Sequence, residues 1–127
     1  SGVEVKLMIP YRSDEKTSHE ASMSYMGRVL KAGVEVLQYS KGFLHSKTLV
    51  IDDEIGIIGS ANIDLRSFEQ NFEVSAFIYD ETHSKHLKEL FLKDTKVCKK
   101  LSYYKWSNRP KSRKFIQALA RLLSPIL

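Results

Sequence analysis

The chain has 127 residues, one cysteine and a formal net charge of +5 at pH 7. This length fits a single domain with a sizeable core, and one cysteine excludes an internal disulfide framework. Hydrophobic residues make up 43% of the sequence and charged residues 28%, which indicates a folded globular chain rather than a disordered one. No apolar run approaches the length that spans a bilayer.

The chain does not start with methionine. Ser1 and Gly2 lead almost at once into a strand-like run. We therefore expect a processed chain or a piece of a longer protein, so the missing apolar span says nothing about the parent. The single cysteine, Cys98, is expected to be a buried and inert thiol.

The first third of the chain predicts a βαβ unit. Residues 3–10 alternate between apolar and polar side chains up to Pro10, which predicts a strand. Residues 18–32 carry apolar side chains at helical spacing before Gly33, and 34–39 form a second strand-like run. A strand, a helix and a strand this close together predict parallel pairing and the α/β class.

The rest of the chain predicts a mixed sheet flanked by helices. Residues 45–62 predict a hairpin, 71–80 another strand and 81–97 a helix. A polar, aromatic connection then leads to a last amphipathic helix at 113–123. We expect an α/β fold with a mixed β-sheet, and one domain over 1–127.

The hairpin carries polar side chains at its open end. If Asp53 and Glu54 form a two-residue turn, His45 lies opposite Asn62. The residues two positions further in, Lys47 and Ser60, are then also opposite each other, and all four side chains share one face. Four hydrogen-bond donors on an otherwise apolar face predict an anion there, and phosphate is a good candidate. The alternative for each residue taken singly is an ordinary, satisfied polar group at the surface.

Glu73 lies between two apolar residues in a predicted strand, where a lone carboxylate is costly. It is expected to accept a hydrogen bond from one ring nitrogen of His45 and so aim the other nitrogen outward. The alternative is a carboxylate at the rim of an edge strand. The other histidines, His19, His83 and His86, are expected to face solvent, and their spacing predicts no metal site.

His45-x-Lys47-xxxx-Asp52, followed by Gly59-Ser60-x-Asn62, resembles the HKD signature of the phospholipase D superfamily. The stretch FLHSKTLVIDDEIGIIGSANIDLRSFEQNFEV is more narrowly similar to the second motif region of bacterial cardiolipin synthases. The tail segments WSNRP and ARLLSP resemble the end of that family, so the resemblance covers nearly the whole chain.

The resemblance implies a phospholipase D-like half-domain that exchanges phosphodiesters through a phosphohistidine, without a metal or other cofactor. It assigns catalysis to His45 and Lys47, substrate binding to Asn62 with support from Ser60, and orientation of the histidine to Glu73. One histidine attacks phosphorus, and a histidine of a second motif protonates the leaving alcohol. Which role falls to His45 is open.

Two further residues come with this resemblance. Asp52 belongs to the signature and so to the catalytic set, yet seven strand residues place its backbone roughly 23 Å from that of His45. The strand geometry therefore favours a structural role near the turn. Arg66 is a candidate phosphate ligand at the rim of the site, and Asp64 also follows Asn62; an ion pair for Arg66 is equally compatible with the sequence.

The complete HKD signature, with its aspartate and the Gly-Ser-x-Asn segment, occurs only once in the sequence, so one chain does not supply both catalytic histidines. The expected partner is the N-terminal HKD half of a parent chain, or a second copy. The resemblance implies that two molecules of phosphatidylglycerol give cardiolipin and glycerol. It also implies that the parent lies at the bacterial cytoplasmic membrane, while the chain itself is expected to be soluble and inactive alone.

Charge is distributed unevenly along the chain. Residues 1–94 hold 11 basic and 15 acidic residues, whereas 95–127 hold 9 basic residues and no acidic one. The tail, about 96–127, is therefore either a solvated basic surface or a site for an anionic membrane. The apolar stripe of its last helix either packs on the core or enters the lipid surface.

Two alternatives to a phosphatidyltransferase stay open. One is a single-motif phosphodiesterase that cleaves nucleic acid as a homodimer; the basic tail with Tyr103, Tyr104 and Trp106 favours it, although a nucleic-acid partner is not expected. The other is a membrane-binding module without activity, which leaves the polar face of the hairpin unexplained.

Overall fold

The computed structural model describes residues 2–13 and 15–123, except for the side chains of Leu65, Arg66 and Leu123. The chain divides into two compact units. Unit 1 combines residues 1–43 with 97–127, and unit 2 comprises residues 44–96. Within the described residues, no helix is both long and apolar enough to cross a membrane.

Unit 1 starts with the predicted βαβ arrangement. Strand β1 (Lys6–Pro10), helix α1 (Lys16–Lys31) and strand β2 (Glu35–Tyr39) follow in order, and the two strands pair in parallel. Helix α1 ends where Gly33 takes a left-handed φ of 88° and its N–H donates to the carbonyl of Leu30. The expectation of a parallel pair and of the α/β class is confirmed.

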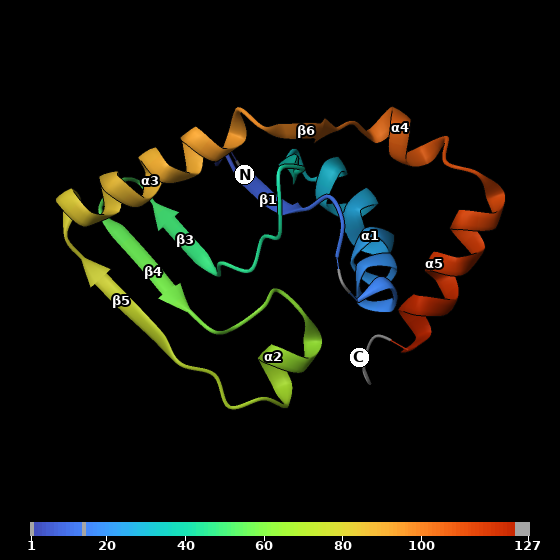
Figure 1. Cartoon of the computed structure of the whole chain (residues 1–127), viewed down its shortest axis with the longest axis horizontal. Coiled ribbons are helices and arrows are strands. Elements are labelled where there is room, and N and C mark those ends of the chain that lie inside the picture. The colour runs from blue at the N-terminus through green and yellow to red at the C-terminus, as the bar shows by residue number, and fades with distance from the viewer. Residues whose placement is uncertain (1, 14, 124–127) are drawn as a thin grey trace. The chain divides into compact units, whose positions relative to one another are not determined.

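The tail completes unit 1. Strand β6 (Cys98–Leu101) pairs antiparallel with β2, so this three-stranded sheet is mixed. Helix α4 (Tyr103–Ser107) and helix α5 (Lys111–Leu123) follow, and α5 packs along α1 (Figure 1). Strand β6 is absent from the sequence-based prediction. The expected burial of Cys98 is only partly realised, because its side chain is half-buried in β6.

The core of unit 1 forms where α1 covers the sheet. The fully buried Val36 of β2 packs with Met23, Met26 and Leu101. The ring of Trp106 packs at the edge of this cluster, and its Nε1–H donates to the carbonyl of Met23 at 2.8 Å. These contacts join α1, β2, β6 and α4 into one hydrophobic core.

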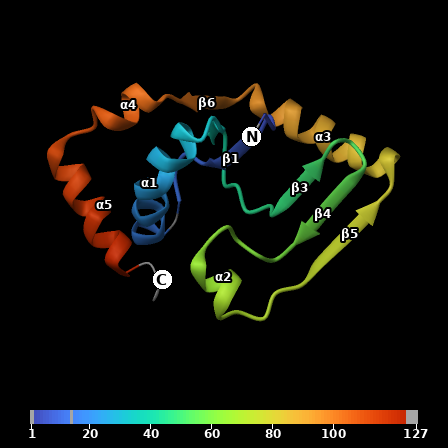
Figure 2. The ribbon, with the colours of Figure 1, turned by 180° about the vertical axis from the view of Figure 1, so that it is seen from behind.

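Unit 2 is an antiparallel sheet with one helix on its face. Strands β3 (Thr48–Ile51), β4 (Ile55–Gly59) and β5 (Ser75–Tyr79) lie side by side in that order (Figure 2). Helix α2 (Leu65–Glu69) lies in the β4–β5 connection, and helix α3 (Glu81–Thr95) packs on the sheet. Gly56 allows this packing, since a Cβ there would lie 2.9 Å from a methyl carbon of Leu87.

The sheet of unit 2 has a second, apolar face. The strand register places the odd-numbered residues of β3, β4 and β5 on one face of the sheet. Gly56 and helix α3 lie on the opposite face. Four large side chains of the odd-numbered face are exposed in the described part of the chain: Leu49, Ile51, Phe77 and Tyr79. Antiparallel sheets often have one solvated face, but that face is normally polar; an exposed apolar face of this kind is typical of contact surfaces.

Candidate functional site

The hairpin register differs from the prediction. Asp52 and Asp53 both take left-handed φ angles, 48° and 62°, and the N–H of Glu54 donates to the carbonyl of Ile51 at 3.0 Å. The loop therefore has three residues instead of two, and Ile51 pairs with Ile55. Aspartate tolerates this conformation, which is why a longer turn forms without glycine.

This change shifts every pair of the hairpin by one position. The N–H of Gly59 donates to the carbonyl of Lys47 at 3.0 Å, so Lys47 lies beside Gly59 and not opposite Ser60. The predicted pairing of His45 with Asn62 is wrong for the same reason. Within paired strands, a shift of one residue moves a side chain to the other face, so this register does not place Lys47 and Ser60 on one face as predicted.

The two residues of the H-x-K motif precede the first hairpin strand. His45 and Lys47 lie in the extended segment before Thr48, with the imidazole exposed and the lysine half-buried. The Nζ of Lys47 donates to the carbonyl of His45 at 2.8 Å. This bond fixes the ammonium next to the histidine backbone, which places a cation beside the candidate catalytic residue.

Glu73 is the centre of a hydrogen-bond network in unit 2. The hydroxyl of Ser60 donates to its Oε2 at 2.5 Å, and the side-chain amide of Asn71 donates to its Oε1 at 3.2 Å. Hydrogen bonds from the hydroxyls of Ser60 and Ser67 and from Asn71 hold the pKa of Glu73 below its ordinary value, and the charge of Lys47 acts in the same direction. Glu73 is therefore a carboxylate at neutral pH.

Ser67 connects Glu73 to residues 59–62, the GSAN segment. The sequence-based prediction missed this residue. Its buried hydroxyl accepts the backbone N–H of Asn62 at 3.1 Å, and its own N–H donates to the carboxylate of Asp64 at 2.7 Å. Thus Ser60, Asn62 and Glu73, which the sequence predicted as one site, are joined through Ser67. A serine in the middle of a five-residue helix gives no motif that would have identified it.

The remaining predicted site residues lie apart from this network or outside the described part. Asp52 is in the β3–β4 turn, at the opposite end of β3 from Lys47, which agrees with a structural role. The side chain of Arg66 lies outside the described residues. The predicted bond from Glu73 to a ring nitrogen of His45 stays a prediction. Among the described residues, no group of histidine, cysteine, aspartate or glutamate side chains could hold a metal ion.

The other histidines differ from one another. His83 is exposed and its Nδ1 lies 2.7 Å from Oδ1 of Asp80, and His86 is exposed on α3. The expectation that His19 faces solvent is wrong. It is half-buried, and this burial lowers the pKa of its imidazole, so it is neutral at pH 7.

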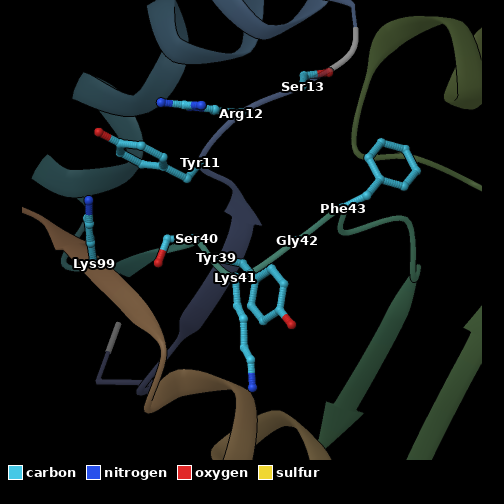
Figure 3. A pocket seen from close by; sticks show the side chains of 9 residues that line it. All are labelled: Tyr11, Arg12, Ser13, Tyr39, Ser40, Lys41, Gly42, Phe43 and Lys99. Atoms are coloured by element: carbon cyan, nitrogen blue, oxygen red, sulfur yellow. The ribbon is translucent and has the colours of Figure 1, made fainter.

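A hollow of about 580 Å³ lies in unit 1, where β1 and β2 end at their carboxyl ends. Loops at the carboxyl ends of parallel strands are a common place for ligands. Figure 3 shows that its side chains diverge: Tyr11 and Arg12 point to one side and Lys41 to another. The ammonium of Lys99 lies 4.4 Å from the ring centre of Tyr11. The hollow therefore has no single focus of positive charge.

A protein-family model described as the PLD-like domain of cardiolipin synthase matches residues 1–95. The chain belongs to this family. The match covers β1 to α3, and so includes the H-x-K motif, the hairpin and Glu73.

Curated relatives match the whole chain. It is 52% identical over 127 residues to cardiolipin synthase 1 of Staphylococcus epidermidis and 48% identical to the major cardiolipin synthase ClsA of Bacillus subtilis, covering 100% of this chain and 26% of each relative. The cardiolipin synthase of Geobacillus is 45% identical, and the match covers 25% of it. The chain thus spans about a quarter of the length of these relatives.

A solved structure shares the fold. The phospholipase D family member Nuc from Salmonella typhimurium superposes with a TM-score of 0.66 at 19% identity, over 80% of this chain and 66% of that chain. This similarity confirms the expected phospholipase D-like fold.

Proposed function

We propose that this chain is the C-terminal catalytic half-domain, residues 1–127, of a phosphatidyltransferase that makes cardiolipin from two molecules of phosphatidylglycerol. The observation that carries the proposal is the match of the whole chain, at 45–52% identity, to proteins described as cardiolipin synthases. The H-x-K segment and the Glu73 network supply residues of the types that such a transfer needs.

The proposed reaction has two steps. A histidine nitrogen attacks the phosphorus of the first phosphatidylglycerol, forms a P–N bond and expels glycerol, which takes a proton from the second histidine. The terminal hydroxyl of the second phosphatidylglycerol then attacks the same phosphorus, returns its proton to that histidine and breaks the P–N bond. His45 is one of the two histidines in this scheme.

The other residues stabilise charge on the phosphoryl group. Lys47, next to His45, contributes a cation for the phosphoryl oxygens, and the exposed amide of Asn62 contributes hydrogen bonds. Ser60 and Ser67 hold Glu73 ionised, and Glu73 orients His45 in the complete site. Arg66 remains a candidate phosphate ligand, and Asp52 stabilises the turn.

The second histidine comes from a partner. The preferred partner is the N-terminal HKD half of the same protein, since the chain spans only a quarter of its relatives. The exposed apolar face of the β3–β4–β5 sheet is a suitable contact surface, and a second copy of the chain is the alternative partner. In both cases the substrate lipid implies contact with the cytoplasmic membrane of a bacterium.

The test measures cardiolipin and released glycerol with phosphatidylglycerol vesicles, using a two-motif protein that carries this chain as its C-terminal part. His45→Ala is expected to lower the rate by roughly 10²–10⁴-fold, which is the range for a lost acid–base group. His86→Ala, a change of an exposed histidine in the same unit, leaves the rate unchanged. The proposal also requires that the isolated 127-residue chain forms no cardiolipin as a monomer.

One observation favours a second candidate, a nuclease that works as a homodimer. The basic tail exposes Tyr103 and Tyr104, at 42% and 76%, and exposed aromatic rings beside cations suit single-stranded nucleic acid. Cleavage of an oligonucleotide that depends on His45, without glycerol release from phosphatidylglycerol, would replace the first proposal by this one.

A further inference from the structure

A second pocket of unit 1 collects positive charge without an equal number of carboxylates. Its volume is about 300 Å³, and the buried side chains of Met23, Leu101 and Gln117 contribute to its walls. Four cationic side chains line it: Arg12, Lys105, Arg109 and Arg113. The half-buried His19 also lines it, and its imidazole is neutral at pH 7 because burial lowers its pKa.

Arg109 is held rigidly in this pocket. Its Nε donates to Oε1 of Gln117 and its Nη1 to the carbonyl of Trp106, each at 2.6 Å, and the guanidinium stacks 3.8 Å from the centre of the Trp106 ring. Gln117 is only 1% exposed and donates to Glu20 at 2.8 Å. Among the described residues, Nη2 of Arg109 has no hydrogen-bond partner. A preorganised guanidinium with free donors suits an oxyanion.

The carboxylate beside this pocket is already engaged. Glu20 accepts hydrogen bonds from Gln117 and from Arg113, the latter at 3.2 Å. Within the described residues, Arg12 and Lys105 form no ion pair. Cations gathered around a partly enclosed space repel one another, and an anion between them removes this repulsion. The larger hollow of Figure 3 lacks such convergence, because its lysines point apart.

We propose that this pocket binds a phosphoryl group, as a phosphate ester whose carbon part lies against Trp106 and Met23. Arg109 and Arg113 offer forked donors to two phosphoryl oxygens, while Lys105 and Arg12 add point charges. The site lies wholly within unit 1 and does not rest on the proposed transferase activity. The same chemistry fits a soluble phosphate ester and a phospholipid headgroup.

Trp106 is the single tryptophan of the chain, so its fluorescence reports on the pocket directly. The test titrates the 127-residue chain at constant ionic strength with three probes: inorganic phosphate, glycerol 3-phosphate, and dihexanoyl phosphatidylglycerol below its micelle concentration. We expect a saturable change with each probe. Tighter binding of glycerol 3-phosphate identifies a soluble ester as the preferred ligand, and tighter binding of the lipid identifies a headgroup. A response to acetate as strong as that to phosphate would overturn the phosphoryl assignment.

A pair of double variants separates the pocket from overall charge. Arg12→Gln with Lys105→Met removes two pocket cations that make no ion pair among the described residues, and should weaken phosphate binding by at least about tenfold. Arg28→Gln with Lys114→Met removes two exposed cations of the same unit outside the pocket and should leave binding within about twofold. Equal weakening by both pairs, or no saturable change in the unaltered chain, would overturn the proposal.

Discussion

Ser60 and Glu73 are joined by a hydrogen bond of 2.5 Å from the serine hydroxyl to Oε2 of the carboxylate. The same hydroxyl accepts the backbone N–H of Val74 at 3.0 Å. One side chain thus ties the end of β4 to the segment that enters β5, and it also holds the charge state of Glu73. Ser60 therefore has a structural role that does not depend on contact with a substrate.

Replacement of this serine should therefore change an ionisation equilibrium. Ser60→Ala removes the largest cause of the lowered pKa of Glu73, so that pKa should rise towards the ordinary glutamate value. Carbon-detected NMR titration of the carboxyl group measures it. Ser75→Ala changes a neighbouring exposed serine and should leave the pKa unmoved.

The lowered pKa of Glu73 also makes the stability of the fold depend on pH. Because the pKa of Glu73 is lower in the folded than in the unfolded chain, its ionised form stabilises the fold at neutral pH. This stabilisation is lost as the pH falls from the ordinary glutamate pKa down through the folded value. Ser60→Ala should show a smaller loss in that window in urea unfolding at several pH values, and an unchanged acid profile would contradict the role of Ser60.

The βαβ unit and the hairpin differ in how well the sequence predicts them. The βαβ unit was predicted correctly, because apolar periodicity determines its elements and chain length determines their parallel pairing. The register of the hairpin was wrong, because two aspartates adopted the left-handed conformation that was expected of neither. Side-chain identity restricts a turn only statistically, and one extra loop residue reverses every face.

Strand β6 and Ser67 were missed for a different reason. The strand reads as charged, since it contains two lysines; Lys100 pairs with Glu35 at 2.8 Å and Lys99 stacks on Tyr11. As an edge strand of its sheet, it tolerates such residues. Ser67 enters the site only because α2 returns the chain to Glu73. Both features depend on tertiary contacts, which no local pattern contains.

Gly27 is required by the Trp106 ring. A Cβ at this position would lie 2.3 Å from an atom of the ring. Alanine normally stabilises a helix interior relative to glycine, but Gly27→Ala should lower the free energy of unfolding by about 1–3 kcal/mol through overpacking. Thermal or urea unfolding followed by Trp106 fluorescence measures this effect.

Gly42→Ala is the matched control, because nothing lies within 4 Å of the added Cβ and the position does not need a positive φ. Its free energy of unfolding should change by less than about 0.5 kcal/mol. If the two variants were equally stable, the close packing of Trp106 on α1 would be incorrect.

Asp80 caps helix α3. Its Oδ1 accepts the N–H of His83 at 2.8 Å, and the hydrogen bonds from His83 lower the pKa of the Asp80 carboxyl. Asp80→Ala should lower the melting temperature by roughly 2–6 °C, as expected for a lost N-cap. The contribution of the ionised cap disappears as the pH falls below the ordinary aspartate range, so wild type and variant should converge in acid.

Asp80→Asn tests the same cap with a neutral acceptor. Asparagine caps helices about as well as aspartate, so this variant should melt close to wild type at neutral pH. It should not show the loss of stability in acid that comes from protonation of Asp80. A melting temperature as low as that of Asp80→Ala would show that charge, and not the cap hydrogen bond, stabilises α3.

The last helix joins positive charge to an exposed apolar stripe. One side of α5 packs on α1 through the buried Gln117 and Ala120. The described apolar residues of the other side remain exposed: Phe115, Ile116, Leu119 and Leu122. The stripe was expected either to pack on the core or to enter a lipid surface. The structure does not pack these four residues on the core, and a lipid surface suits an apolar stripe flanked by cations.

We therefore expect the chain to bind vesicles that contain phosphatidylglycerol at low salt and to release them as salt increases. Each lysine or arginine near an anionic bilayer contributes about 1 kcal/mol, and this attraction is screened within a Debye length. Phe115→Ser with Leu122→Ser should weaken sedimentation with these vesicles, because it removes the two most exposed of the apolar side chains that the structure describes on α5. Leu90→Ser with Leu92→Ser, at exposed positions of α3, is the control and should bind as wild type does. Equal binding to neutral vesicles would exclude the electrostatic part of this mechanism, and no binding to either kind would leave α5 as a structural cap on α1.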